Sequence, residues 1–97
     1  MKAPLYHIKP IQKLQARRLG VIIQPSIRGN YKIDIYNKKN EYITSIGDKR
    51  YEDYASYAEK EGFEVADRRR ELYMKRHKTD SQVEGSRGWF AAKILWS

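Results

Sequence analysis

The chain has 97 residues and a formal net charge of +8, from 20 Lys and Arg against 12 Asp and Glu. A domain of this size buries roughly 60–70% of its surface on folding, so we expect one domain with one modest core. The absence of cysteine excludes disulfides, thiol catalysis and cysteine-based zinc sites. No apolar run reaches the roughly 18 residues of a membrane span. The first residues lack the apolar region of a secretory signal, which predicts an intracellular or intraparticle protein.

The positive charge is concentrated in the first half of the sequence. Residues 1–50 hold 11 Lys and Arg against 3 Asp and Glu, whereas residues 51–97 hold 9 of each. Within the second half, residues 52–67 are mainly acidic and residues 68–97 mainly basic. Charge sorted in this way is typical of a protein that binds a polyanion. It also favours contacts between the acidic and basic patches of two copies.

The start of the chain predicts an extended arm followed by a short helix. Pro4 and Pro10 disfavour regular structure, so residues 1–10 are expected to form the arm and residues 11–97 the folded domain. A helix is predicted over residues 10–19, because proline suits its first turn and a glycine follows it. The apolar residues of this helix lie roughly on one side, together with Arg18: Ile11, Leu14 and Leu19.

Alternating apolar and polar residues predict three strands after this helix. They cover residues 21–25, 31–36 and 41–46. Residues 37–40 form a polar hairpin turn that exposes Lys38 and Lys39, and Gly47 and Asp48 are expected to end the sheet.

Helical spacing replaces the alternation in the second half. Tyr51, Tyr54 and Tyr57 indicate a helix that ends at Gly62 and is capped by Asp48 or Asp53. Further helices are predicted over residues 63–78 and 89–96, separated by a loop over residues 79–88. The expected fold class is therefore α+β, a three-stranded antiparallel β-sheet with helices packed on one face.

The candidate nucleic-acid contacts are basic residues in two groups. The first group lies before residue 40: Lys13, Arg17, Arg18, Arg28, Lys32, Lys38 and Lys39. The second lies on the helix predicted over residues 63–78: Arg68, Arg70, Lys75 and Lys78. Bases on one helix can straddle phosphates. The alternative is a solvated helix face with the pairs Glu64–Arg68 and Glu71–Lys75, while Arg69 and Arg76 point toward the apolar stripe and can pair with Asp48 or Asp53.

The last helix is apolar nearly all round, which is typical of a segment buried in the fold or in a partner. We expect a homodimer whose interface includes large apolar side chains of this helix: Trp89, Phe90, Ile94, Leu95 and Trp96. The competing interpretation is that the helix fills the core of its own chain.

The sequence offers little for catalysis. His7 and His77 are the only histidines, and neither has a serine or aspartate at a suggestive spacing. The acids of residues 52–67 suit a solvated surface better than a magnesium site. Gly85 to Gly88 can bind a phosphate, but a helix N-cap at Ser86 is the preferred interpretation. We therefore expect no enzymatic activity, no cofactor and no metal.

Several short strings along the chain resemble a known family. They are KLQARRLG at residues 13–20, SIGD at 45–48, ADRR at 66–69, RHK at 76–78 and GSRGWFA at 85–91. Over residues 12–96 the chain resembles a family of small basic proteins of nucleocytoplasmic large DNA viruses, carried by marseilleviruses and mimivirus relatives. The resemblance implies a compact domain and a viral context. It supplies no activity.

Charge and resemblance together predict a small basic viral protein that binds DNA without strong sequence preference, in genome packaging or as a virion component. RNA stays open as the nucleic acid. The alternative is an interaction protein of the virion or viral factory, without a nucleic-acid role, that assembles through acidic and basic patches and has other virion proteins as partners. The expected locations are the virion and the host cytoplasm or nucleus, with no membrane association.

Overall fold

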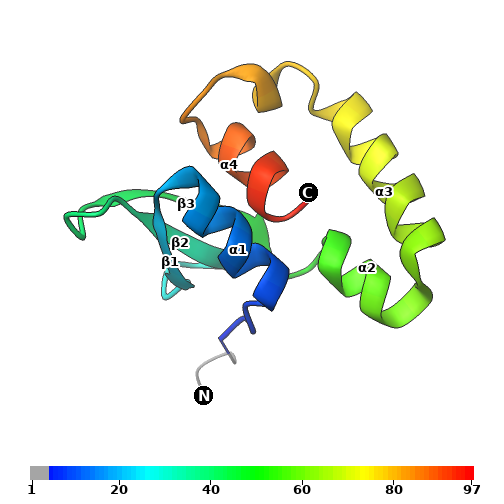
Figure 1. Ribbon diagram of the computed structural model, residues 1–97, viewed down its shortest axis with the longest axis horizontal. Helices are drawn as coiled ribbons and strands as arrows, with labels where there is room; N and C mark the ends of the chain where they lie inside the picture. Colours follow the sequence, from blue (N-terminus) through cyan, green and yellow to red (C-terminus); the bar gives the residue numbers. More distant parts are fainter. Residues whose placement is uncertain (1–4) are drawn as a thin grey trace. The chain divides into compact units, whose positions relative to one another are not determined.

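The computed structural model describes residues 5–97, which form two compact units that divide between Tyr51 and Glu52 (Figure 1). It contains a three-stranded antiparallel sheet and helices, which confirms the α+β class predicted from the sequence. Of the expected arm, residues 1–4 lie outside the described residues, and residues 5–9 have no regular secondary structure. The expectation of a single folded domain over residues 11–97 stays a prediction.

The first unit contains one helix and the whole sheet. These elements are α1 (Pro10–Leu19), β1 (Ile22–Pro25), β2 (Tyr31–Tyr36) and β3 (Tyr42–Asp48), with the strands in the order β1-β2-β3. The sheet ends at Gly47 and Asp48 as expected, although both residues belong to β3, where Asp48 pairs with Tyr31. Gly47 has a φ of +77°, which costs a glycine little, so the strand passes through it.

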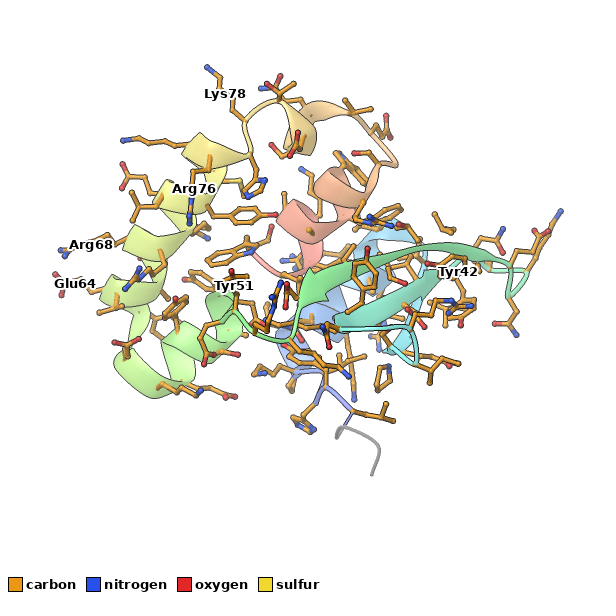
Figure 2. All side chains as sticks on the ribbon, turned by 180° about the vertical axis from the view of Figure 1, so that it is seen from behind. Tyr42, Tyr51, Glu64, Arg68, Arg76 and Lys78 are labelled. Atoms are coloured by element: carbon orange, nitrogen blue, oxygen red, sulfur yellow. The ribbon has the colours of Figure 1, made fainter. Side chains whose placement is uncertain are left out.

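The two sides of the sheet differ in what they bury. Ile33, Ile35 and Ile46 are fully buried and lie on one side, where the alternation of the strands places them together. Helix α1 lies on this side (Figure 1). Tyr42 lies on the opposite side (Figure 2), which no described helix of the first unit covers.

The side of α1 that carries Ile11 and Leu14 does not face the core. Ile11 and Leu14 are 38% and 37% exposed, whereas Gln12 and Ala16 are buried. Gln12 is buried without a penalty because its amide oxygen accepts from the backbone N–H of Lys9 at 2.9 Å, while its amide nitrogen donates to a tyrosine hydroxyl at 2.8 Å. The hydrogen bonds of one glutamine therefore set which side of the helix faces inward.

The second unit is helical. Its elements are α2 (Tyr54–Glu61), α3 (Phe63–Arg76), the 3-10 helix η1 (Asp80–Gln82) and α4 (Arg87–Ile94). Asp53 caps α2 by accepting from the Ser56 N–H at 2.9 Å, and Ser86 caps α4 by accepting from the Trp89 N–H at 3.2 Å. Both caps were among the sequence predictions. Helix α2 begins later than its tyrosine spacing suggested, α3 ends two residues earlier than predicted, and α4 begins two residues earlier.

The C-terminal residues close this helical unit. The Trp96 ring stacks on the Tyr73 ring of α3, with the ring centroids 4.5 Å apart and an angle of 11° between the ring planes. The centroid of the Tyr57 ring of α2 lies 6.2 Å from that of Trp96. The Leu95 carbonyl accepts from the Tyr54 N–H at 3.0 Å. One short segment thus fixes both α2 and α3.

The burial of this segment bears on the expected dimer interface. Phe90, Ile94, Leu95 and Trp96 are at most 9% exposed in the single chain, and Trp89 is half-buried. Little of their apolar area is therefore left for a partner to cover. This burial is what the competing interpretation requires, in which the last helix fills the core of its own chain. The homodimer stays a prediction.

Gly88 allows α4 and η1 to approach closely. A Cβ at this position would lie 2.7 Å from the Asp80 Cβ and 2.8 Å from its carbonyl oxygen. We expect Gly88→Ala to destabilise the protein by about 1–3 kcal/mol through overpacking, despite the better helix propensity of alanine. Urea denaturation measures the change. Lys93→Ala, at an exposed site of the same helix, is the control and should stay within about 0.5 kcal/mol of the wild type. Equal stability of the two variants would contradict this account of the contact.

Candidate nucleic-acid interface

A buried carboxylate organises the uncovered side of the sheet. Asp34, in the middle of β2, is 1% exposed. Its Oδ1 accepts from the hydroxyls of Ser26 and Ser45, each at 2.6 Å. Its Oδ2 accepts from Nη1 of Arg28 at 2.6 Å and from the Ile27 N–H at 3.4 Å. The carboxylate thereby ties the β1–β2 turn to the centre of the sheet and to β3.

These bonds keep Asp34 ionised. Burial alone raises the pKa of a carboxyl group. The hydrogen bonds from Ser26, Ser45, Ile27 and Arg28 outweigh that effect and hold the pKa of Asp34 below its ordinary value. The result at neutral pH is a buried negative charge that pairs with Arg28.

Arg28 is held flat by this charge. Its guanidinium carbon lies 3.9 Å from the centroid of the Tyr42 ring, and its Nη1 also donates to the Tyr36 hydroxyl at 3.3 Å. The Tyr42 hydroxyl is 2.7 Å from the Ser45 hydroxyl, and the rings of Tyr36 and Tyr42 meet edge to face at 6.0 Å. Arg28 and Tyr42 thus form a fixed cation–π pair on the sheet surface.

The strand register extends this pair into a row. Ile22 of β1 is opposite Tyr36 of β2, which is opposite Tyr42 of β3. An irregularity in the β2–β3 pairing next to Tyr36 places Tyr42, rather than Ile43, across from it. Ile22 is 37% exposed and Tyr42 43% exposed. We call Ile22, Tyr36, Tyr42 and the overlying Arg28 the aromatic row.

The first unit also carries a set of exposed cations. It consists of exposed residues of α1 and of the β2–β3 hairpin: Lys13, Arg17, Arg18, Lys38 and Lys39. In the described part of the chain, none of them forms an ion pair. A Cβ at Gly20, the C-cap of α1, would lie 3.6 Å from Cε of Lys38, so the end of the helix and the hairpin are neighbours. We call these five residues the basic rim.

Acids of the first unit do little to neutralise the basic rim. Asp34 pairs with Arg28, and Asp48 pairs with Arg50 at 2.7 Å. The hydrogen bonds from Arg50 lower the pKa of Asp48 to about 2. Glu41 accepts from the Asn37 side chain at 2.9 Å, and it is the only other acid before residue 52. The positive field of the first unit therefore falls on the basic rim.

Two predicted phosphate contacts have other roles. Lys32 is 4% exposed, with Nζ 5.3 Å from the centroid of the Tyr6 ring, and so it is not accessible to a phosphate. Its aliphatic stem is long enough to be buried on the sheet, which the alternating pattern does not reveal. Arg28 is committed to Asp34, although it keeps one exposed face.

The bases of α3 are mixed with acids. Arg68 and Lys75 are exposed, as is Lys78, which lies two residues beyond the end of the helix. Arg70 pairs with Asp67 at 3.4 Å and lies over the Tyr54 ring. Neither i,i+4 pair expected on this helix forms an ion pair among the described residues.

Two further arginines of α3 were expected to reach an aspartate. Arg69 lies over the Tyr57 ring at 5.3 Å, and Arg76 is exposed. Figure 2 shows Arg68 projecting beside Glu64. The field at α3 is therefore weaker than the field at the basic rim.

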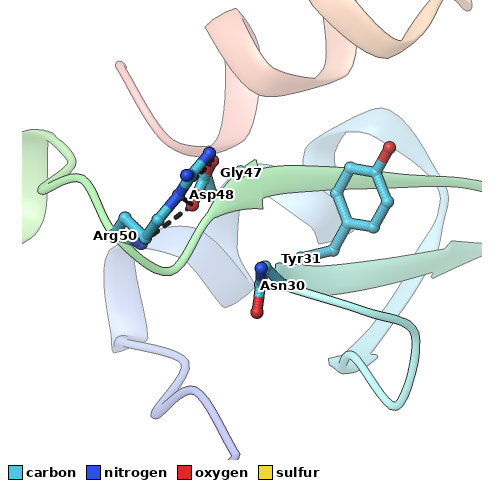
Figure 3. Close-up of a pocket in the computed structure, with 5 residues that line it drawn as sticks. All are labelled: Asn30, Tyr31, Gly47, Asp48 and Arg50. Carbon is cyan, nitrogen blue, oxygen red and sulfur yellow. Dashed lines mark hydrogen bonds and ion pairs between the residues drawn. The ribbon is translucent and has the colours of Figure 1, made fainter.

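A shallow hollow of about 180 Å³ lies at the other end of the sheet (Figure 3). Asn30, Tyr31, Gly47, Asp48 and Arg50 line it. The Asp48 carboxylate accepts four hydrogen bonds from Arg50 alone, so its oxygens are already occupied. This engagement leaves the hollow with little capacity to bind a polar ligand.

Residues 5–97 contain no candidate metal site and no candidate membrane span. No group of three or more His, Cys, Asp or Glu side chains is placed to hold a metal ion. None of the described helices is both long and apolar enough to cross a membrane. The catalytic and metal expectations stay predictions.

Comparison with protein-family models, curated proteins and solved structures gives no match to this chain. The resemblance to the giant-virus family accordingly stays a prediction. Asp34, Tyr36 and Tyr42 were not among the predicted site residues. The sequence YKIDIY of β2 did contain a signal for Asp34. An acid in the middle of a strand must have hydrogen-bond or charge partners if it is buried.

Removal of the Asp34 charge should destabilise the first unit. Asp34→Asn keeps the shape but leaves Arg28 and two serine hydroxyls without their anionic acceptor. We expect a loss of about 3 kcal/mol at neutral pH. Urea denaturation measures it, with Glu41→Gln as the control at an exposed carboxylate. A loss no larger than that of the control would contradict the structural role of Asp34.

The same carboxylate predicts an acid-sensitive stability. Because its folded-state pKa is lowered, its contribution is fully present above the unfolded pKa of about 3.9. That contribution is lost as the pH falls through the lower folded-state pKa. The stability difference between wild type and Asp34→Asn should therefore shrink as urea titrations move from neutral pH to about pH 2. A difference that is independent of pH would rule out the charge as its source.

Proposed function

We propose that the protein binds nucleic acid without strong sequence preference, through the basic rim of the first unit. One observation carries the proposal: five exposed cations on α1 and the adjoining hairpin lack acidic partners among the described residues. Lysine and arginine side chains of this kind contact phosphates and release counterions, which gives affinity without reading the bases. DNA is the proposed ligand, as the sequence analysis suggested.

The biological setting is part of the same proposal. The resemblance to small basic proteins of large DNA viruses supports a role in genome packaging or as a virion component. Exposed acids on α2, such as Glu59 and Glu61, keep the alternative of assembly through acidic and basic patches. That alternative predicts salt-dependent self-association with no affinity for nucleic acid.

Charge removal at the hairpin tests the nucleic-acid interface. Lys38→Gln/Lys39→Gln should weaken binding to any DNA sequence about equally and lower the slope of log affinity against log salt by about 1.5. Fluorescence anisotropy over a salt series measures both quantities. Lys60→Gln/Lys93→Gln removes two exposed charges of the second unit and is the control, with an expected slope equal to that of the wild type.

Equal slopes for both double variants and the wild type would contradict binding at the hairpin. A third variant, Arg68→Ala/Lys75→Ala/Lys78→Ala, tests the α3 contacts predicted from the sequence. A loss of affinity confined to this variant would move the interface to the second unit.

A further inference from the structure

We infer that the ligand is single-stranded nucleic acid, whose unpaired bases stack on the aromatic row while its phosphates contact the basic rim. The inference rests on the proposed function and adds to it the strandedness of the ligand and the surface that holds the bases. It follows from the stacked pair, the row across the strands and the position of the cations.

The Arg28–Tyr42 pair is the first observation. A guanidinium plane and a tyrosine ring are the surfaces on which proteins stack unpaired bases. The Arg28 side chain is 41% exposed although Asp34 fixes it, and Tyr42 is 43% exposed. A flat group that is already ordered loses little conformational entropy when a base covers it. The ion pair with Asp34 does not by itself explain why the Arg28 guanidinium also lies over the exposed Tyr42 ring.

The row across the sheet is the second observation. Ile22, Tyr36 and Tyr42 occupy one level on three adjacent strands, on the side that no described helix of the first unit covers. Adjacent strands lie about 4.8 Å apart, so the row extends the apolar surface beyond one ring. More than one base can therefore be accommodated along it.

The position of the cations is the third observation. Lys38 and Lys39 lie in the hairpin that joins Tyr36, the last residue of β2, to Tyr42, the first residue of β3. These two lysines of the basic rim therefore adjoin the same end of the sheet as the aromatic row. A backbone on the hairpin lysines places its unpaired bases within reach of the row, whereas a duplex keeps its bases stacked inside the helix and offers only phosphates.

Three probes separate the contribution of the bases from that of the phosphates. They are oligo(dT) of about 20 nucleotides, an abasic oligonucleotide of equal length and a duplex of equal length. We expect wild type to bind oligo(dT) at least about tenfold more tightly than the abasic strand, since stacking of one base contributes about 1–3 kcal/mol. Oligo(rU) distinguishes RNA from DNA as the source of the single strand.

Substitutions of Tyr42 test the surface itself. Tyr42→Leu should weaken oligo(dT) binding about tenfold and leave abasic binding within about twofold, whereas Tyr42→Phe retains the ring and should stay near wild type. Tyr51→Leu is the matched control, because Tyr51 is an exposed tyrosine of the same unit outside the row. Ile22→Tyr adds a ring at an exposed position of the row and should tighten oligo(dT) binding; it serves the test if Tyr42→Leu does not fold.

The failures of the two proposals are distinguishable. Equal affinity of wild type for oligo(dT) and the abasic strand would overturn the stacking inference and keep the nucleic-acid proposal. Tighter binding to the duplex than to oligo(dT) would also overturn the inference. No salt-dependent binding to any probe would overturn both. If Tyr42→Leu folds and binds oligo(dT) like wild type, or if Ile22→Tyr leaves oligo(dT) affinity unchanged, the row is not the stacking surface.

Discussion

The ionised carboxylate of Asp34 is the constraint on which the first unit depends. An anion buried in a small sheet is stable only when hydrogen bonds and an opposite charge replace its water. Two serine hydroxyls, a backbone N–H and Arg28 supply them, from the β1–β2 turn and from β3. Satisfying one charge therefore joins the β1–β2 turn to β2 and β3 and orients Arg28 over Tyr42.

The same constraint connects stability to function. Arg28 cannot leave Asp34 without exposing an unpaired buried charge, so its plane stays on Tyr42. Arg28 and Tyr42 are thereby held in one arrangement on the sheet surface, whereas the lysines of the adjoining hairpin are exposed and carry no ion pair in the described structure. A stacked surface for bases beside exposed cations for phosphates suits a ligand that offers both groups at once. The second unit, in which acids and bases balance, lacks this division.

Local patterns were enough to predict much of the fold. Alternation located β2 over Tyr31–Tyr36, and Asp53 and Ser86 marked helix caps because a cap depends on residues close in sequence. Contacts between residues far apart in the sequence could not be predicted from local sequence patterns. The partners of Asp34 come from residues 26–45, and Gln12 displaced Ile11 from the inward side through two side-chain hydrogen bonds. Lys38 and Lys39 were placed on a hairpin tip, but their proximity to the aromatic row depends on strand register.

Backbone amide chemical shifts test the central claim most directly, because they report which surface the ligand covers. Titration of the intact protein with oligo(dT) should perturb the amides of Arg17 to Ile22, Arg28 and Tyr36 to Tyr42, and leave residues 63–78 largely unchanged. The abasic strand should perturb the basic rim but not Arg28 or Tyr42. Perturbations centred on α3, or identical perturbations by the two strands, would contradict the account.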